Sequence, residues 1–332
     1  MPVQAYLFSE QDGQGDHLGL RVTPPERYAP AGADVLGPLR GQLSSVRVPL
    51  AAGIKSELYL FEQEDFEGPF LRVSAGDEAF EGNLESWNWE NRAQSAVLIS
   101  TQHGGRTERA VSFRDLFLSA WQRTVVAQIS AALEQMQWWS VRIDGDTSMT
   151  WDLAVKPRPA PDEAYVRITQ GLIFQTPRGD THVMVRYLVR ITTPAGGGTP
   201  TGSAVLPWDA SIQSGSNAEV IDVLNRAEAS VRHAVEQELD VSFREIFGSH
   251  SDSTLHFRAF GIYALPGVPP VEGEKTAVGD TSTDVTIVLA LQPIASPAAP
   301  QPDYGSAEID AEPTPRSKGL ASSHVRLPRA RS

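Results

Sequence analysis

The sequence predicts a multidomain protein with an all-β sandwich over residues 1–102, an α+β domain over residues 112–295, and a disordered tail over residues 296–332. Three observations support this prediction. Short apolar strands repeat in the first part, helical and strand periodicities follow in the middle, and Pro, Ala and Ser dominate the end. Residues 103–111, which begin with a Gly-containing polar stretch, are expected to form a linker.

The sandwich is predicted by an internal repeat. Three segments of one copy match three segments of the other: residues 6–12 with 59–65, 20–22 with 71–73, and 44–48 with 95–99. Each copy is expected to form four short strands separated by Gly- and Pro-containing turns. One copy alone buries too little apolar surface, so the two copies should face each other as two packed sheets.

The second copy contains an aromatic–glycine hairpin pattern formed by Phe61, Phe66 and Gly68. The two aromatic rings can pack over a folded hairpin, and the glycine supplies a backbone conformation that a side chain would disfavour. Together with the aromatic-led turn at residues 87–95, this pattern resembles the βγ-crystallin family. The resemblance implies two Greek-key motifs packed into one domain.

The first copy follows this pattern less closely. It keeps Phe8 and Gly15, but Gly13 stands where the second aromatic is expected. The resemblance covers residues 3–100 and implies nothing for the remainder of the chain.

The resemblance also implies calcium sites, each formed by turns of both motifs around a stretch written N/D-N/D-x-x-S/T-S. The corresponding stretches are residues 40–45 (RGQLSS) and 90–95 (ENRAQS). A hard cation needs several oxygen ligands, and Ser44, Glu90 and Asn91 could supply them at one weak shared site.

The second site that the resemblance implies, here called the companion position, would pair Gly41 with Gln94. There the positive charge of Arg40 would repel a cation. The alternative is that these turns only close the motifs. In that case Ser45 and Ser95 would satisfy backbone groups.

The second half predicts two helices and an antiparallel sheet. The first helix begins at the N-cap Ser112, with Asp115 in its first turn, and the second at a capping box of Ser216 and Glu219. Strands are expected around residues 151–155, 166–174, 183–191, 254–263 and 284–291.

Candidate chemistry outside the repeat is sparse. His250 and His256 lie in a polar stretch, but their spacing fits neither a helical nor a zinc-finger metal site. Asp144, Asp146 and Asp152 could act as paired acids or ion ligands, or could simply belong to a turn. No catalytic constellation or cofactor site other than calcium is predicted.

The amino-acid composition disfavours several classes of binding partner and site. The net charge is -13, which disfavours nucleic acid, and no apolar window is long enough to span a membrane. The absence of cysteine excludes disulfides and zinc–thiolate sites. No secretory signal is seen, so a cytoplasmic location is expected unless export follows a route that the sequence does not display.

The expected function is therefore that of a non-catalytic binding or structural protein with an unknown protein or glycan partner. One alternative is an enzyme or toxin-like effector with its site in residues 112–295. Another is a subunit of a larger assembly, docked by the basic tail that contains Arg326, Arg329 and Arg331. The oligomeric state is not set by the sequence.

Overall fold

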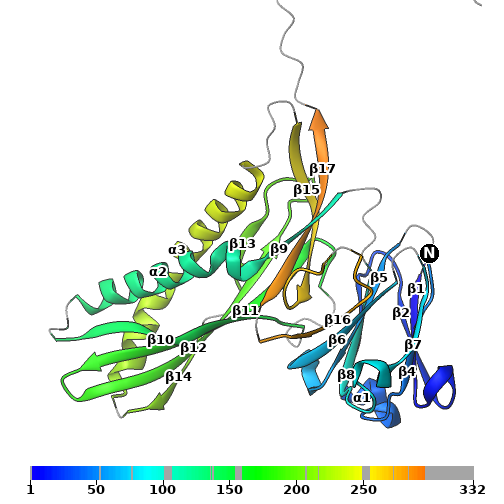
Figure 1. Cartoon of the computed structure of the whole chain (residues 1–332). Helices are drawn as coiled ribbons and strands as arrows, with labels where there is room; N and C mark the ends of the chain where they lie inside the picture. Colours follow the sequence, from blue (N-terminus) through cyan, green and yellow to red (C-terminus); the bar gives the residue numbers. More distant parts are fainter. Residues whose placement is uncertain are drawn as a thin grey trace, which may run out of the picture. The chain divides into compact units, whose positions relative to one another are not determined.

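The chain folds mostly as antiparallel β-sheet with two long helices (Figure 1). The computed structural model describes residues 2–295 apart from gaps at 52–53, 76–77, 101–106, 135, 137, 154–158, 206–207, 216, 249–254, 272 and 283. The tail predicted over residues 296–332 lies outside the described residues, and so does His250.

Two antiparallel sheets are built from the repeat. One has the order β2-β1-β4-β7, with β1 (Val3–Phe8), β2 (His17–Val22), β4 (Ser45–Val48) and β7 (Phe80–Asn83). The other contains β6-β5-β8-β3, with β3 (Tyr28–Ala31), β5 (Ser56–Phe61), β6 (Pro69–Ala75) and β8 (Ser95–Ser100). Each copy thus contributes three strands to one sheet and its third strand to the other.

Short helical turns connect these strands at equivalent places. They are η1 (Gln11–Gly13), α1 (Ala33–Leu36), η2 (Gly37–Leu39), η3 (Glu64–Phe66) and η4 (Leu84–Trp87). In both hairpins the central aspartate, Asp12 or Asp65, is left-handed, with φ of 55° and 58°. The two hairpins therefore have the same local fold although their sequences differ.

The second half contains a five-stranded sheet and a three-stranded sheet. The larger is built from β10 (Ser140–Trp151), β11 (Glu163–Thr176), β12 (Gly179–Thr192), β13 (Thr201–Ala204) and β14 (Asp209–Ser214). The smaller has the order β15-β17-β9, with β9 (Thr107–Ser112), β15 (Leu255–Pro266) and β17 (Val285–Ala295).

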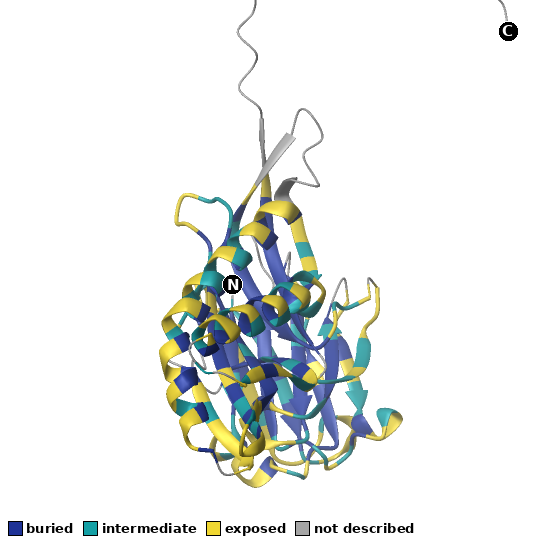
Figure 2. Ribbon diagram, turned by 90° about the vertical axis from the view of Figure 1, so that its left-hand side faces the viewer, coloured by how far each residue is buried: buried dark blue, intermediate teal, exposed yellow. Residues whose placement is uncertain are grey.

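The helices α2 (Phe113–Leu133) and α3 (Glu219–Gly248) pack against each other, α2 against β10 and α3 against β13 and β14. Figure 2 views this side, with exposed residues on the outer surface of the helices and buried strands behind them. The apolar spacing that predicts α2 corresponds to its buried face, which includes Phe117, Trp121 and Val125. The predicted pair of helices and the antiparallel strands are confirmed.

Three details differ from the sequence predictions. Residues 107–111, expected to end a linker, instead belong to β9, because the apolar strand β17 is central and needs a hydrogen-bonded partner on each side. The strand expected through residues 151–155 ends instead at Trp151, and Val155 lies outside the described residues. At the start of α3, Asn217 Oδ1 accepts the Glu219 N–H at 3.2 Å, and Ser216 is not among the described residues.

The N-terminal cap of α2 is formed as expected. Ser112 Oγ accepts the backbone N–H of Asp115 at 3.0 Å and donates to the buried carboxylate of Asp284. Because Asp284 directly precedes β17, this contact joins the start of α2 to the sheet beneath it.

The sheet that contains β5 is buried on both faces. Leu58 and Leu60 belong to the core between the two sheets of the repeat, whereas Tyr59 and Phe61 belong to the core of the second half. The ring centroids of Phe61 and Trp151 are 5.8 Å apart. Strand β16 (Thr276–Asp280) also pairs with β6 and extends this sheet.

Tyr28 makes a further link between the two halves. Its hydroxyl donates to the carbonyl of Ala264 at 3.2 Å and accepts the N–H of the same residue at 3.1 Å. Ala264 lies on β15, an edge strand of its sheet, so the hydroxyl satisfies two backbone groups that no neighbouring strand reaches.

We expect Tyr28→Phe to lower the free energy of unfolding by about 1 to 3 kcal/mol, because both buried backbone groups of Ala264 lose their partner. Urea unfolding of the full chain measures the effect. Tyr6→Phe is the matched control, since the Tyr6 hydroxyl donates to the nearby Gln4 side chain and to no backbone group among the described residues. Equal losses for both variants would contradict the role assigned to Tyr28.

Candidate functional site

The two turns that carry the predicted calcium stretches face each other. Gly41 donates its N–H to the carbonyl of Ala93, and Asn91 donates its N–H to the carbonyl of Leu43, each at 2.8 Å. Gly41 and Asn91 occupy equivalent positions and are both left-handed, with φ of 63° and 59°. The turns are therefore related by an approximate two-fold exchange of backbone hydrogen bonds.

Side chains of the two turns also form hydrogen bonds from one turn to the other. Ser44 Oγ donates to Glu90 Oε1 at 3.0 Å, and Arg40 Nε donates to Gln94 Oε1 at 2.7 Å. Arg40 also forms an ion pair with Glu64 of the second hairpin. The structure thus brings Ser44 of the first copy to Glu90 of the second, with Asn91 next to them on the same turn.

These two positions differ in chemistry. Ser44 and Glu90 offer a hydroxyl and a carboxylate oxygen, which are the hard ligands that calcium prefers. At the companion position the guanidinium of Arg40 already bonds Gln94 and Glu64. Of these two positions, the Ser44–Glu90 position is the closer to the oxygen ligands that calcium prefers.

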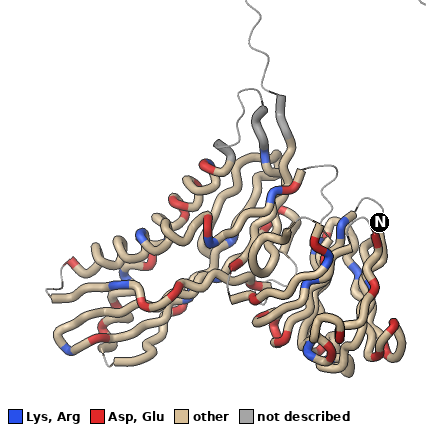
Figure 3. The backbone as a smooth tube through the Cα atoms, in the orientation of Figure 1, with Lys and Arg blue, Asp and Glu red and all other residues tan. Residues whose placement is uncertain are grey.

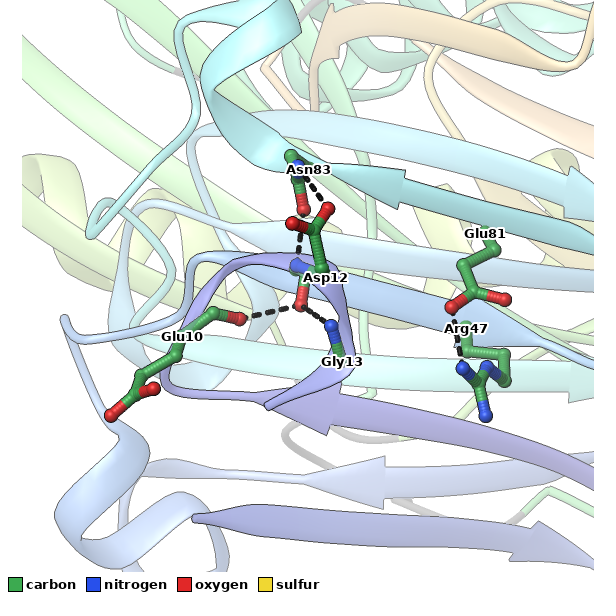
Figure 4. Close-up of polar contacts among 7 residues, drawn as sticks. Glu10, Asp12, Gly13, Arg47, Glu81 and Asn83 are labelled. Atoms are coloured by element: carbon green, nitrogen blue, oxygen red, sulfur yellow. Dashed lines mark hydrogen bonds and ion pairs between the residues drawn. The ribbon is translucent and has the colours of Figure 1, made fainter. Parts of the chain in front are cut away.

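The last residue of each stretch is a serine, Ser45 or Ser95, and its side chain closes a folded hairpin. In the first copy Ser45 Oγ donates to the carbonyl of Glu10 at 2.6 Å and accepts the N–H of Gly13 at 3.0 Å. Asp12 in the same hairpin bonds Asn83 through its backbone and its side chain (Figure 4). The hairpin is thereby fixed to the strands of both copies.

Ser95 does the same in the second copy. Its Oγ donates to the carbonyl of Gln63 at 2.7 Å and accepts the N–H of Phe66 at 3.1 Å. The expectation that Ser45 and Ser95 satisfy backbone groups is confirmed.

A second feature, which the sequence does not predict, is a cleft of about 750 Å³ between the repeat and the three-stranded sheet. One wall comes from β5 and β6, with Glu57 and Arg72. The opposite wall is a row across β15, β17 and β9, where Tyr263 pairs with Val288 and Val288 with Ala110. Residues 270–271 and 273–275 complete the cleft.

Glu57 is the most buried acid of this cleft. Its side chain is 12% exposed, accepts a hydrogen bond from the Tyr59 hydroxyl at 2.8 Å, and lies 3.4 Å from Arg72 Nη1. Burial raises the pKa of Glu57, although Arg72 and Tyr59 oppose that shift. Burial likewise holds the pKa of Tyr263 well above its usual range, and the charge of Glu108 adds to this shift.

The other acids that were singled out do not form a common site. Asp144 Oδ2 lies 2.7 Å from His182 Nδ1, and Asp152 Oδ2 lies 2.6 Å from Arg167 Nη2. Within the described ranges, no group of three or more Asp, Glu or His side chains could hold a metal ion. Asp144, Asp146 and Asp152 therefore do not form one ion site: the first two lie on β10, the third directly follows it, and Asp144 and Asp152 have different partners. The alternative that Asp144 and Asp146 lie in a turn is also not met, since both belong to β10.

The histidine pair suggested by the sequence falls outside what can be placed. Residue 250 and the side chain of residue 256 are not among the described parts. None of the helices in the described ranges is both long and apolar enough to cross a membrane.

Comparison with known proteins adds little. No family model matches this sequence, and no curated protein matches it. One solved structure, described as the crystal structure of lipopolysaccharide binding protein, matches 65% of this chain and 54% of its own, at 10% identity and a TM-score of 0.18. The matched region spans about half of that protein, and a TM-score this low supports no conclusion about fold or function.

We expect Ser95→Ala to lower the free energy of unfolding by about 1 to 3 kcal/mol, because a buried carbonyl and a buried N–H lose their partner. Ser56→Ala on the neighbouring strand is the matched control. Ser56 Oγ is buried and has no hydrogen-bond partner among the described residues, so its removal should cost little. Chemical unfolding of both variants measures the difference, and a Ser95→Ala variant as stable as the control would contradict the hairpin role.

Proposed function

We propose that this chain is a non-catalytic binding or structural protein built on a βγ-crystallin-like module of two Greek-key motifs. The exchange of the third strands, β3 and β7, between the two sheets supports this proposal. The equivalent folded hairpins, each closed by a serine, support it as well. The partner would be a protein or a glycan that binds the surface of the module.

We further propose one weak calcium site formed by Ser44, Glu90 and Asn91. The observation that carries it is the 3.0 Å contact between Ser44 and Glu90, which joins an oxygen donor of each motif. Carbonyl oxygens of the same turns could complete the ligand set. With one carboxylate, the site is expected to bind calcium weakly.

Calcium would act here as a link between the motifs. It would draw the hydroxyl of Ser44 and the carboxylate of Glu90 onto one cation in place of their mutual hydrogen bond. Because the folded chain would bind the ion and the unfolded chain would not, binding would raise stability in proportion to calcium concentration.

For a dissociation constant of about 1 mM, about 10 mM calcium should stabilise the full chain by about 1.4 kcal/mol. The rise in melting temperature measures this gain, with magnesium as the control ion. The full chain is used because the sandwich shares a buried face with the second half.

Glu90→Gln should abolish the calcium-dependent shift, whereas Glu245→Gln, an exposed acid on α3, should retain it. Arg40→Ala should also retain it, since Arg40 lies at the companion position. No shift with calcium, or an undiminished shift in Glu90→Gln, would refute the site.

A further inference from the structure

We propose that a second cleft, here called the hydroxyl-lined cleft, binds a neutral carbohydrate. The inference rests on the binding function proposed above and narrows its partner to a glycan. The cleft has a volume of about 480 Å³, within the range of small-molecule sites in proteins. It lies where β10, β11 and β12 approach the sheet that contains β6 and β16 (Figure 1). Its lining includes five hydroxyl side chains: Ser148, Thr150, Thr169, Thr281 and Ser282.

One wall of this cleft is a polar face of the five-stranded sheet. Ser148 on β10 pairs with Thr169 on β11, and Thr169 pairs with Arg186 on β12, so the three side chains form a row across three strands. Thr150 and Arg167 form the next row on the same face, because side chains alternate along a strand. Neighbouring strands lie about 4.8 Å apart, so the hydroxyl groups of this wall are closely spaced.

The opposite wall is the second hairpin of the repeat with the turn after β16. Gly68 donates its N–H to Thr281 Oγ1 at 2.8 Å, and its carbonyl accepts the N–H of Thr281 at 3.1 Å. Arg167 connects this hairpin to the sheet, since it lies 3.2 Å from Glu67 Oε1 and 2.6 Å from Asp152 Oδ2. The two walls are therefore held together by contacts already present, as in the largely pre-formed sites that bind small molecules.

Several uncharged polar groups of the cleft are available to a ligand. Four side chains make no hydrogen bond to another described residue, namely Gln63, Thr150, Thr169 and Ser282. The hydroxyl of Ser148 has one long contact, 3.4 Å, to the carbonyl of Ser282. Hydroxyl and amide groups both donate and accept hydrogen bonds, and so do the hydroxyl groups of a sugar. The cleft thus offers one ligand several partners of the kind that a carbohydrate requires.

The charges of the cleft cancel. Two basic and two acidic side chains line it: Arg167, Arg186, Glu67 and Asp280. Arg186 Nη1 also lies 3.7 Å from Asp209 Oδ2. Acidic and basic residues are likewise interspersed along the chain (Figure 3). Among the lining residues, Pro69 alone has an apolar side chain. Balanced charge attracts an ion only weakly, and the sparse apolar lining gives an apolar molecule little contact, so a neutral polar ligand fits this cleft best.

Saturation-transfer NMR on the full chain tests the inference with four neutral probes, the methyl glycosides of glucose, galactose, mannose and N-acetylglucosamine. At least one should bind, with a dissociation constant of about 1 mM. Glucuronate and cyclohexanol, which add a negative charge or keep a single hydroxyl, should bind much more weakly. Binding of none of the four glycosides, or equal binding of glucuronate or cyclohexanol, would overturn the proposal.

Two variants place the sugar in the cleft. Thr169→Val keeps the shape of the side chain and removes a hydroxyl, and Gln63→Met removes an amide from an exposed hairpin residue. Each should weaken binding of the tightest glycoside about threefold to tenfold. Thr107→Val, at an exposed threonine of β9 outside the cleft, is the matched control and should bind as the unaltered chain does. Binding that neither cleft variant weakens would show that the sugar binds elsewhere and would refute the assignment.

The variant Glu90→Gln separates this inference from the calcium proposal. It should bind the glycoside normally although it should lose the calcium-dependent shift. A calcium-dependent shift without glycoside binding would reject the hydroxyl-lined cleft and leave the proposed binding module in place. Glycoside binding without any calcium-dependent shift would reject the calcium site and support the cleft.

Discussion

The organisation of this protein depends on one β-sheet that is covered on both faces. The sheet with the order β16-β6-β5-β8-β3 presents Leu58 and Leu60 to the core of the repeat and Tyr59 and Phe61 to the core of the second half. Burial of large aromatic rings is a strong, non-directional contribution to stability. The repeat and the second half therefore share a core, and the charged cleft lies along the margin of that shared surface.

Much of the local structure follows from the sequence. The matching segments of the repeat correspond to equivalent strands, and Ser45 and Ser95 occupy equivalent hydrogen-bonding positions because the two copies share one hairpin geometry. The expected pairing of Ser44 with Glu90 rests on the βγ-crystallin resemblance, which implies that turns of both motifs meet, and in the structure these two turns do meet. Helix α2 was predictable because its apolar period and its N-cap, Ser112, agree.

The shared core and the cleft could not be derived in this way. Residues 59–61 and 97–99 are continuous apolar runs, which is typical of strands buried on both faces, whereas Val46, Arg47 and Val48 alternate as in a strand with one solvated face. Such a run indicates a covering layer but does not identify it. The cleft joins residues as distant as Glu57 and Tyr263, and no spacing rule links side chains brought together only by tertiary packing.

The pairing of β16 with β6 has a consequence for biosynthesis. Strand β6 leaves the ribosome long before residues 276–280, so the nascent chain carries an open sheet edge and an uncovered aromatic surface while most of the second half is still being translated. Open edges and apolar surfaces promote association between unfinished chains. Completion of this fold is thus a late event, and a polypeptide cut short before residue 276 would leave that edge available to its neighbours.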